Sequence, residues 1–113
     1  MMDQKVDIEK LSQITDEQRK QIYSAASRVG KDTIEEVCPA LLRIVLNSER
    51  GVLKNELGRV IFHLQKTETI NSRIGLEKLL DASLMVNPEE TFKILETSDK
   101  EAQELAKEIK KII

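Results

Sequence analysis

Signals that start a helix recur along the 113-residue chain. Residues 15–18 read TDEQ, which fits the capping box, where the first and fourth residues each bond the other's backbone amide. Residues 98–101 read SDKE and fit the same box, and residues 32–35, DTIE, are a looser form with Asp as the first residue. Residues 87–90, NPEE, place a proline at the first helical position, where its missing amide costs nothing. These signals predict a chain of short helices.

The apolar residues between these signals recur at intervals that place them on one face of a helix. Gly30 and Gly51 each follow such a stretch, as expected for a left-handed residue that ends a helix. No segment alternates apolar and polar residues for long enough to require a strand. Six helices are therefore predicted, over residues 16–29, 33–47, 52–66, 72–86, 88–97 and 99–112.

The composition agrees with this pattern. Aromatic residues make up 3% of the chain, and there are 4 Gly and 2 Pro, whereas strands favour aromatic and β-branched residues. Hydrophobic residues reach 40% and charged residues 34%, enough for a core with an ionic surface. We expect an all-α fold with a single compact domain over residues 15–113. The pattern of apolar residues does not predict a secondary structure for residues 1–14.

The helix over 33–47 is predicted to lie centrally, because its apolar residues cover more than half of its circumference. Pro39 lies within it and predicts either a kink, which we favour, or a new helix that begins there. Helix pairs start near residues 15, 51 and 88, a spacing in the range of helical repeats. Two arrangements stay open: three stacked helical hairpins, or a closed, irregular bundle.

Several classes of protein are disfavoured. The formal net charge of −2 gives no nucleic-acid tail or polybasic membrane patch. The first ten residues lack the apolar core of a secretory signal. Arg43 interrupts the longest apolar run, which is far short of the roughly 20 residues of a membrane span. The single cysteine, Cys38, leaves no internal disulfide. By elimination, we expect a cytoplasmic protein that does not associate with membranes.

Catalytic, metal-binding and cofactor-binding residues are not predicted. His63 is the only histidine and lies at the edge of an apolar stripe, and metal sites need three or four ligands. Cys38 falls within the apolar arc of its helix, where cysteine acts as a small hydrophobe. The glycines are isolated and form no phosphate-binding loop. The sequence therefore does not indicate an enzyme.

Three apolar residues lie opposite the main apolar stripes of their helices. They are Phe62 in the helix 52–66, and Ile74 and Met85 in the helix 72–86. Other helices of the same chain would cover them in one interpretation, and a protein partner or a second copy would cover them in the other. Gly58, beside Phe62, favours the second by allowing close approach. We expect a protein–protein interaction or adaptor module without enzymatic activity, with self-association as one form.

A nucleic-acid-associated regulator is the alternative from a different class. It would use a basic cluster on the helix 51–66 and its flank, composed of Arg50, Lys54, Arg59 and Lys66. Neighbouring glutamates dilute this cluster, and no basic face with stacking aromatics stands out. Nucleic acid is therefore the weaker expectation for a partner.

Overall fold

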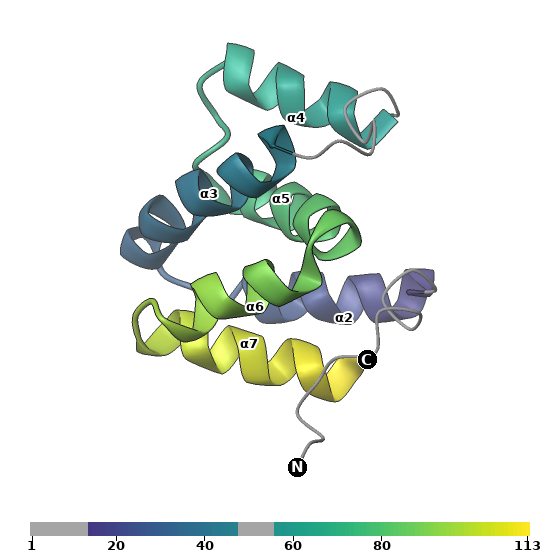
Figure 1. The fold of residues 1–113 in the computed structure, drawn as a ribbon, viewed down its shortest axis with the longest axis vertical. Helices are drawn as coiled ribbons and strands as arrows, with labels where there is room; N and C mark the ends of the chain where they lie inside the picture. The colour runs from purple at the N-terminus through teal and green to yellow at the C-terminus, as the bar shows by residue number, and fades with distance from the viewer. Residues whose placement is uncertain (1–13, 48–55) are drawn as a thin grey trace.

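A computed structural model describes residues 14–47 and 56–113 of the chain (Figure 1). This part of the chain forms six helices and no strand, which confirms the all-α prediction. With the labels of Figure 1, the helices are α2 (Asp16–Ala26), α3 (Lys31–Leu46), α4 (Glu56–Lys66), α5 (Arg73–Val86), α6 (Pro88–Glu96) and α7 (Lys100–Ile112). The radius of gyration is 13.0 Å, close to the ~13 Å of a compact domain of this length. Within the described residues, every helix is too short or too polar to cross a bilayer.

Two of the predicted helix starts are confirmed in atomic detail. The amide of Gln18 donates to Thr15 Oγ1 at 3.1 Å, and Gln18 Oε1 accepts from the amide of Thr15 at 2.9 Å, which completes the capping box of α2. At α6, Asn87 Oδ1 accepts from the amide of Glu90 at 3.1 Å, and Pro88 occupies the first turn. These caps satisfy amides that have no partner inside the helix.

Other helix ends differ from the prediction. Asp99 rather than Ser98 caps α7, because its carboxylate accepts from the amide of Ala102. Gly30 is not a left-handed terminator: its φ of −77° is extended, and it is the N-cap of α3. α3 begins at Lys31, two residues before the predicted start at Thr33. The cause is a tertiary contact, because Glu101 Oε1 of α7 accepts from the amide of the N-cap residue Gly30 at 2.9 Å. Gly51 lies outside the described residues.

Pro39 does not divide α3. The helix runs from Lys31 to Leu46, with Pro39 exposed on its outer side. The alternative in which a new helix begins at Pro39 is therefore wrong, and the apolar face of α3 runs through the proline in one phase.

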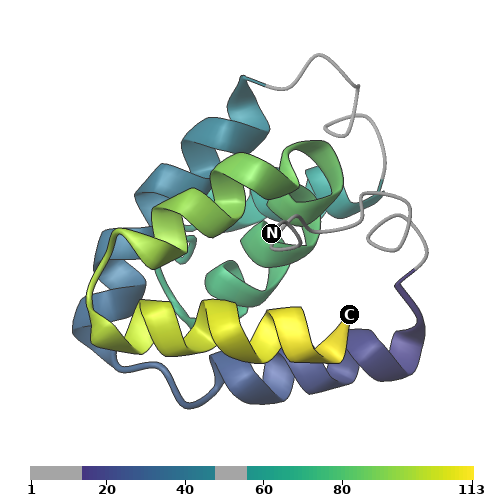
Figure 2. The same ribbon diagram turned by 60° about the horizontal axis from the view of Figure 1, so that its bottom comes forward.

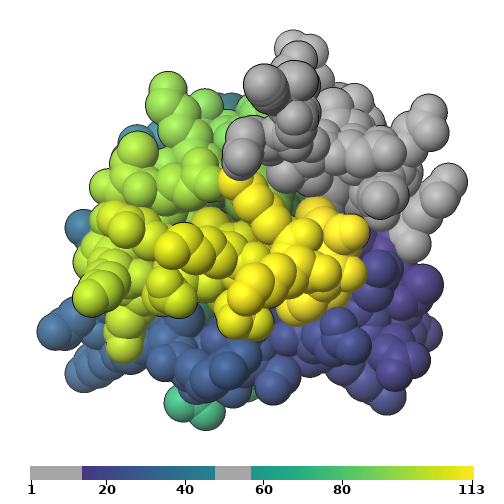
Figure 3. Space-filling model, turned by 90° about the horizontal axis from the view of Figure 1, so that it is seen from below, coloured from purple at the N-terminus to yellow at the C-terminus, as the bar shows by residue number. Residues whose placement is uncertain are grey.

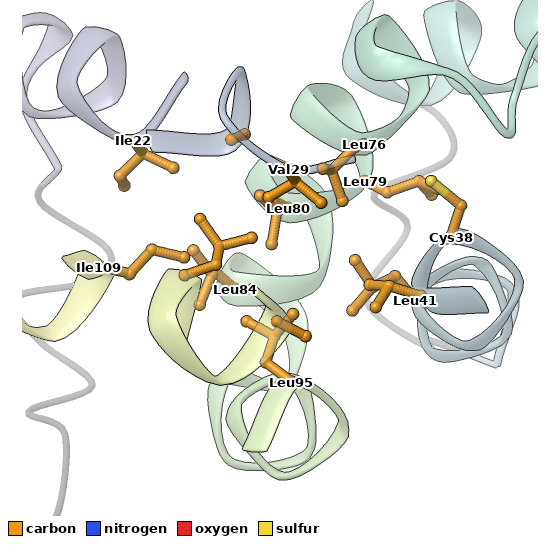
Figure 4. Close-up of a cluster of buried hydrophobic side chains, with 14 of the residues drawn as sticks. Ile22, Val29, Cys38, Leu41, Leu76, Leu79, Leu80, Leu84, Leu95 and Ile109 are labelled. Atoms are coloured by element: carbon orange, nitrogen blue, oxygen red, sulfur yellow. The ribbon is translucent and has the colours of Figure 1, made fainter. Parts of the chain in front are cut away.

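The centre of the bundle is α5, which packs against α2, α3, α4 and α6. The prediction gave this place to the helix over 33–47, but α3 packs on α5 and α6 and only slightly on α7, and its outer side reaches the surface. The leucines of α5 converge in the core with Ile22, Leu41, Leu95 and Ile109 from four other helices (Figure 4). Three buried residues of α5 are small, and this lets the neighbouring helices approach α5 closely enough for it to lie at the centre. They are Gly75, Ala82 and Ser83.

The bundle is closed rather than a stack of hairpins. α2 packs mainly on α7 and α5, so the first and last described helices lie side by side (Figures 1 and 2). The amide of the Gln18 side chain donates to the carbonyl oxygen of Ile112 at 3.2 Å across this contact. Seen from below, α7 lies between α2 and α6 (Figure 3). Of the two arrangements that the sequence left open, the irregular closed bundle is the observed one.

α4 lies at the edge of the bundle and packs mainly on α5 (Figure 1). It ends in a Schellman motif, in which Thr69 N donates to Leu64 O at 2.8 Å and Glu68 N donates to Gln65 O at 3.1 Å. Glu68 has a φ of 59° at the position where glycine is usual. The following turn brings the carbonyl of Ile70 against Gly75 of α5, which leaves no room there for a Cβ atom. The turn thus fixes how α4 meets α5.

Candidate interaction surface on α4 and α5

Four large apolar side chains of the described residues are exposed. Phe62 is 64% exposed, Ile74 57% and Met85 46%; these are the three residues that the sequence placed opposite the main stripes. Leu46, at the end of α3, is 47% exposed and was not predicted, because it falls within an apolar arc that the sequence assigned to the core. The interpretation in which other helices of the described chain cover the first three residues is therefore wrong.

These side chains do not form one patch. Met85 lines a shallow groove between α4 and α2, together with Leu57 and Val60 of α4. Phe62 follows Val60 by two residues, which is about 200° around a helix. Phe62 therefore projects from α4 on the side away from the groove, and the two exposed residues face different directions.

Ile74 and Met85 share one face of α5 but lie far apart on it. They are separated by eleven residues, which is about three turns and about 16 Å along the axis. Lys78 and Asp81 lie on the same face between them, and both contact Tyr23 of α2. The second face of α5 is thus covered by α2 in the middle and open at its ends.

The polar cluster under this groove joins α2 to α5. The hydroxyl of Tyr23 donates a short hydrogen bond to Asp81, and Arg19 Nε lies 3.2 Å from Asp81 Oδ1. The ammonium of Lys78 lies 5.3 Å from the centroid of the Tyr23 ring, within reach of a cation–π contact. Burial, and next the hydrogen bond to Asp81, raise the pKa of Tyr23 above its ordinary value. Tyr23 therefore stays protonated at neutral pH, and the cluster acts as a structural link.

The outer face of α4 carries a stripe of exposed residues at the spacing i, i+3, i+4 and i+7. We call it the α4 stripe, and it consists of Arg59, Phe62, His63 and Lys66. Over residues 57–66 these are the only exposed side chains, and none is acidic. Among the ion pairs of the described residues, none involves Arg59 or Lys66. Both cations are therefore available to a partner.

The stripe combines residues that the sequence analysis assigned to two hypotheses. Phe62 belonged to the protein-binding face, whereas Arg59 and Lys66 belonged to the basic cluster of the nucleic-acid alternative. The other two members of that cluster, Arg50 and Lys54, lie outside the described residues. The sequence shows the helical spacing of the stripe, but it does not show that this face of α4 is exposed.

The environment of Gly58 differs from the prediction that this residue allows a partner to approach closely beside Phe62. It is buried, so it does not open the surface beside Phe62 to a partner. The interpretation that Gly58 admits an external neighbour is therefore not supported.

The two groups with potential reactivity lie in contrasting places. Cys38 is fully buried, and its Sγ lies 4.0 Å from the carbonyl oxygen of Ser72. Burial raises the pKa of the Cys38 thiol to about 12, so the thiolate needed for nucleophilic attack is scarce at neutral pH. His63 is exposed on the outer face of α4, so it does not pair with the buried thiol. Among the described residues, no three His, Cys, Asp or Glu side chains are grouped closely enough to hold a metal ion.

Comparison with known proteins adds no family to these observations. No protein-family model matches the chain, and neither a curated protein nor a solved structure is detectably similar to it. Function must therefore be argued from the surface described above.

Proposed function

We propose that this protein is a non-enzymatic interaction module of the cytoplasm that binds another protein through the exposed apolar side chains of α4 and α5. Self-association through the same side chains is one form of this function. The observation that carries the proposal is the exposure of Phe62, the largest of these side chains, on a helix whose inner face is already packed on α5. Aromatic residues and methionine are enriched where proteins meet.

The energetic argument concerns the ring of Phe62. Complete burial of a Phe side chain is worth about 1.5–3 kcal/mol relative to full exposure, so a partner that covers this ring gains a useful part of that free energy. The ring is carried by a helix that is joined to the bundle by a Schellman turn and by packing on α5. A surface held in place in this way loses little conformational entropy on binding.

Site-specific photo-crosslinking tests the proposal without knowledge of the partner. A benzophenone side chain is placed at position 62 of the full chain, which is then expressed in its own host cell and irradiated. We expect discrete protein adducts at position 62, and weaker ones at positions 74 and 85. The matched control is position 21 on α2, where Gln21 is also exposed to solvent but polar. Equal labelling at positions 62 and 21 would contradict the proposal.

Light scattering coupled to size exclusion separates self-association from a foreign partner. If the chain pairs with itself, the wild type has twice the monomer mass of 12.9 kDa, and the Phe62→Asp variant returns to that mass. A wild type that is monomeric at all concentrations rules out self-association. The crosslinking result then decides whether a different protein binds.

A further inference from the structure

The charge of the α4 stripe distinguishes it from the outer faces of α6 and α7. Arg59, His63 and Lys66 surround Phe62, and no carboxylate is exposed over residues 57–66. By contrast, α6 exposes mainly acidic residues, namely Glu89, Glu90 and Glu96 beside Lys93. The outer face of α7 mixes both signs, as in the pair of Glu104 and Lys107 at 3.6 Å.

The basic character of the stripe is local. The whole chain has a formal net charge of −2, but a potential at the surface decays over about 8 Å at physiological ionic strength. A group that touches the stripe therefore experiences Arg59 and Lys66 more strongly than the average charge of the chain, with exposed Glu68 two residues beyond Lys66 as the nearest described carboxylate in the sequence. Since neither cation is paired within the described residues, a partner need not break an existing ion pair to reach them.

The geometry of the stripe suits an extended acidic ligand with one apolar anchor. Arg59 and Lys66 are seven residues apart, about 10 Å along the axis, and Phe62 lies between them on the same face. Two carboxylates spaced by about two helical turns match this separation. An apolar side chain between those carboxylates would rest on the ring of Phe62.

We infer that the α4 stripe is the docking site for an acidic amphipathic segment of a partner protein. An apolar side chain of that segment packs on Phe62, and its carboxylates pair with Arg59 and Lys66. This inference rests on the proposed interaction function and adds the chemical class of the partner. Arg59 contributes most to orientation, because its planar guanidinium binds a carboxylate in a bidentate manner.

An acidic protein segment fits this stripe better than a nucleic acid does. Duplex DNA carries one negative charge per roughly 1.7 Å, and proteins that bind it commonly make 6–10 phosphate contacts. The stripe presents two permanent cations and one aromatic ring. That number suits a pair of carboxylates, and it is small for a phosphate backbone.

Selection from a displayed library of random 12-residue peptides tests the inference on the full chain. Peptides enriched on the wild type are then measured against the variant Phe62→Ala and the double variant Arg59→Glu/Lys66→Glu. The double variant Lys100→Glu/Lys107→Glu is the matched charge control, since these exposed lysines on α7 have the same spacing. Leu46→Ala is the apolar control, because Leu46 is also exposed but lies on α3.

The expected result is enrichment of peptides that carry Asp or Glu around one large apolar residue. Their affinity should fall about tenfold or more in both stripe variants, since tenfold corresponds to about 1.4 kcal/mol. It should change less than about twofold in the two controls. Added salt should weaken the wild type more than the charge-reversed stripe variant.

Failure of the acidic-partner inference can be distinguished from failure of the proposed interaction function. Peptides that depend on Phe62 but lack acidic residues, or that ignore the charge reversal, would overturn the acidic partner while leaving the interaction function in place. If no enriched peptide depends on Phe62, both ideas fail. A 20-nucleotide single strand that binds through the stripe more tightly than the best peptide would overturn the choice of partner class.

Discussion

α4 and α7 are both amphipathic helices at the surface of the bundle, yet they use their outer faces differently. α7 packs on α2 and α6 and buries its apolar stripe of Ala102, Leu105, Ala106 and Ile109. Its exposed residues are all polar and of both signs. α4 packs mainly on α5, and its outer face places a phenylalanine among unpaired cations.

Side-chain contacts show the same contrast. α7 is connected to the rest of the bundle by polar bonds along its length, including Lys110 to Glu96 at 2.5 Å and Glu101 to the amide of Gly30. In the described residues, no ion pair engages α4. The two helices thus differ in how their exposed side chains are joined to the rest of the described chain.

The sharpest test compares one leucine of α7 with the phenylalanine of α4. Leu105→Ala should lower the free energy of unfolding by about 3 kcal/mol, because Leu105 is buried and the substitution leaves a cavity. Phe62→Ala should change it by no more than about 0.5 kcal/mol, because the ring is exposed. Urea unfolding followed by circular dichroism measures both. A large loss for Phe62→Ala would mean that the ring supports the fold, and the comparison would fail.

Substitution of one glycine near each helix, Gly75 beside α4 and Gly30 beside α7, should also change the free energy of unfolding by different amounts. A Cβ added at Gly75 would lie 1.7 Å from the carbonyl oxygen of Ile70, and backbone cannot move aside cheaply. Gly75→Ala should therefore cost about 2 kcal/mol or more and disturb the joint of α4 with α5.

Gly30→Ala is its control on the α7 side. The added Cβ would lie 3.0 Å from Glu101 Oε1, the end of a flexible side chain, so the cost should be about 1 kcal/mol or less. Thermal unfolding of the two variants measures the difference. Equal costs would show that the turn before α5 can yield.

Acid should weaken the α7 side through Asp99. Its carboxylate accepts from the hydroxyl of Thr33 at 2.5 Å and from the amide of Ala102, and these bonds hold the pKa of Asp99 below its ordinary value. A lowered pKa stabilises the fold above the unfolded-state value near 3.9, and this stability is lost as the pH falls through the folded-state value.

Asp99→Ala removes both bonds. It should cost about 1 kcal/mol at neutral pH, the usual value of a lost helix cap, and should flatten the decline in stability below about pH 4. Unfolding by urea at a series of pH values measures this. A variant that keeps the full acid-induced decline would show that other carboxylates are responsible.

The smallest effect concerns the turn that ends α4. Glu68 adopts a φ of 59°, where a Cβ is unfavourable, so Glu68→Gly should stabilise the chain by about 0.5 kcal/mol after the entropy of glycine in the unfolded state is included. A shift of the thermal midpoint by about 2 °C would be consistent with this gain. No shift, or a loss, would show that the glutamate side chain stabilises the turn by another contact.

The sequence predicted the helices well because their starts depend on local chemistry. The capping box at Thr15 and the proline at position 88 act within one turn, so no tertiary information was needed. The start of α3 was missed because Gly30 has no capping side chain, and Glu101 from α7 accepts from its amide instead. The end of α4 at residue 66 was predicted correctly, but the left-handed residue that follows it, Glu68, was not recognised because glycine is usual at that position.

The candidate site was predicted in part for the same reason. Helical periodicity identified Phe62, Ile74 and Met85 as residues on a second face, and all three are exposed. Periodicity within single helices does not show which faces meet. It therefore did not reveal that Met85 lies in a groove beside α2, on a different side of the molecule from Phe62.

The burial of Cys38 has a practical consequence. It is the only cysteine in the chain, and its thiol is both inaccessible and held protonated. A cysteine introduced at an exposed position is therefore the one that maleimide or spin-label reagents modify in the folded protein. The native chain thus serves as a ready background for attaching a fluorophore or spin label at position 62 or 107, without a substitution in the core.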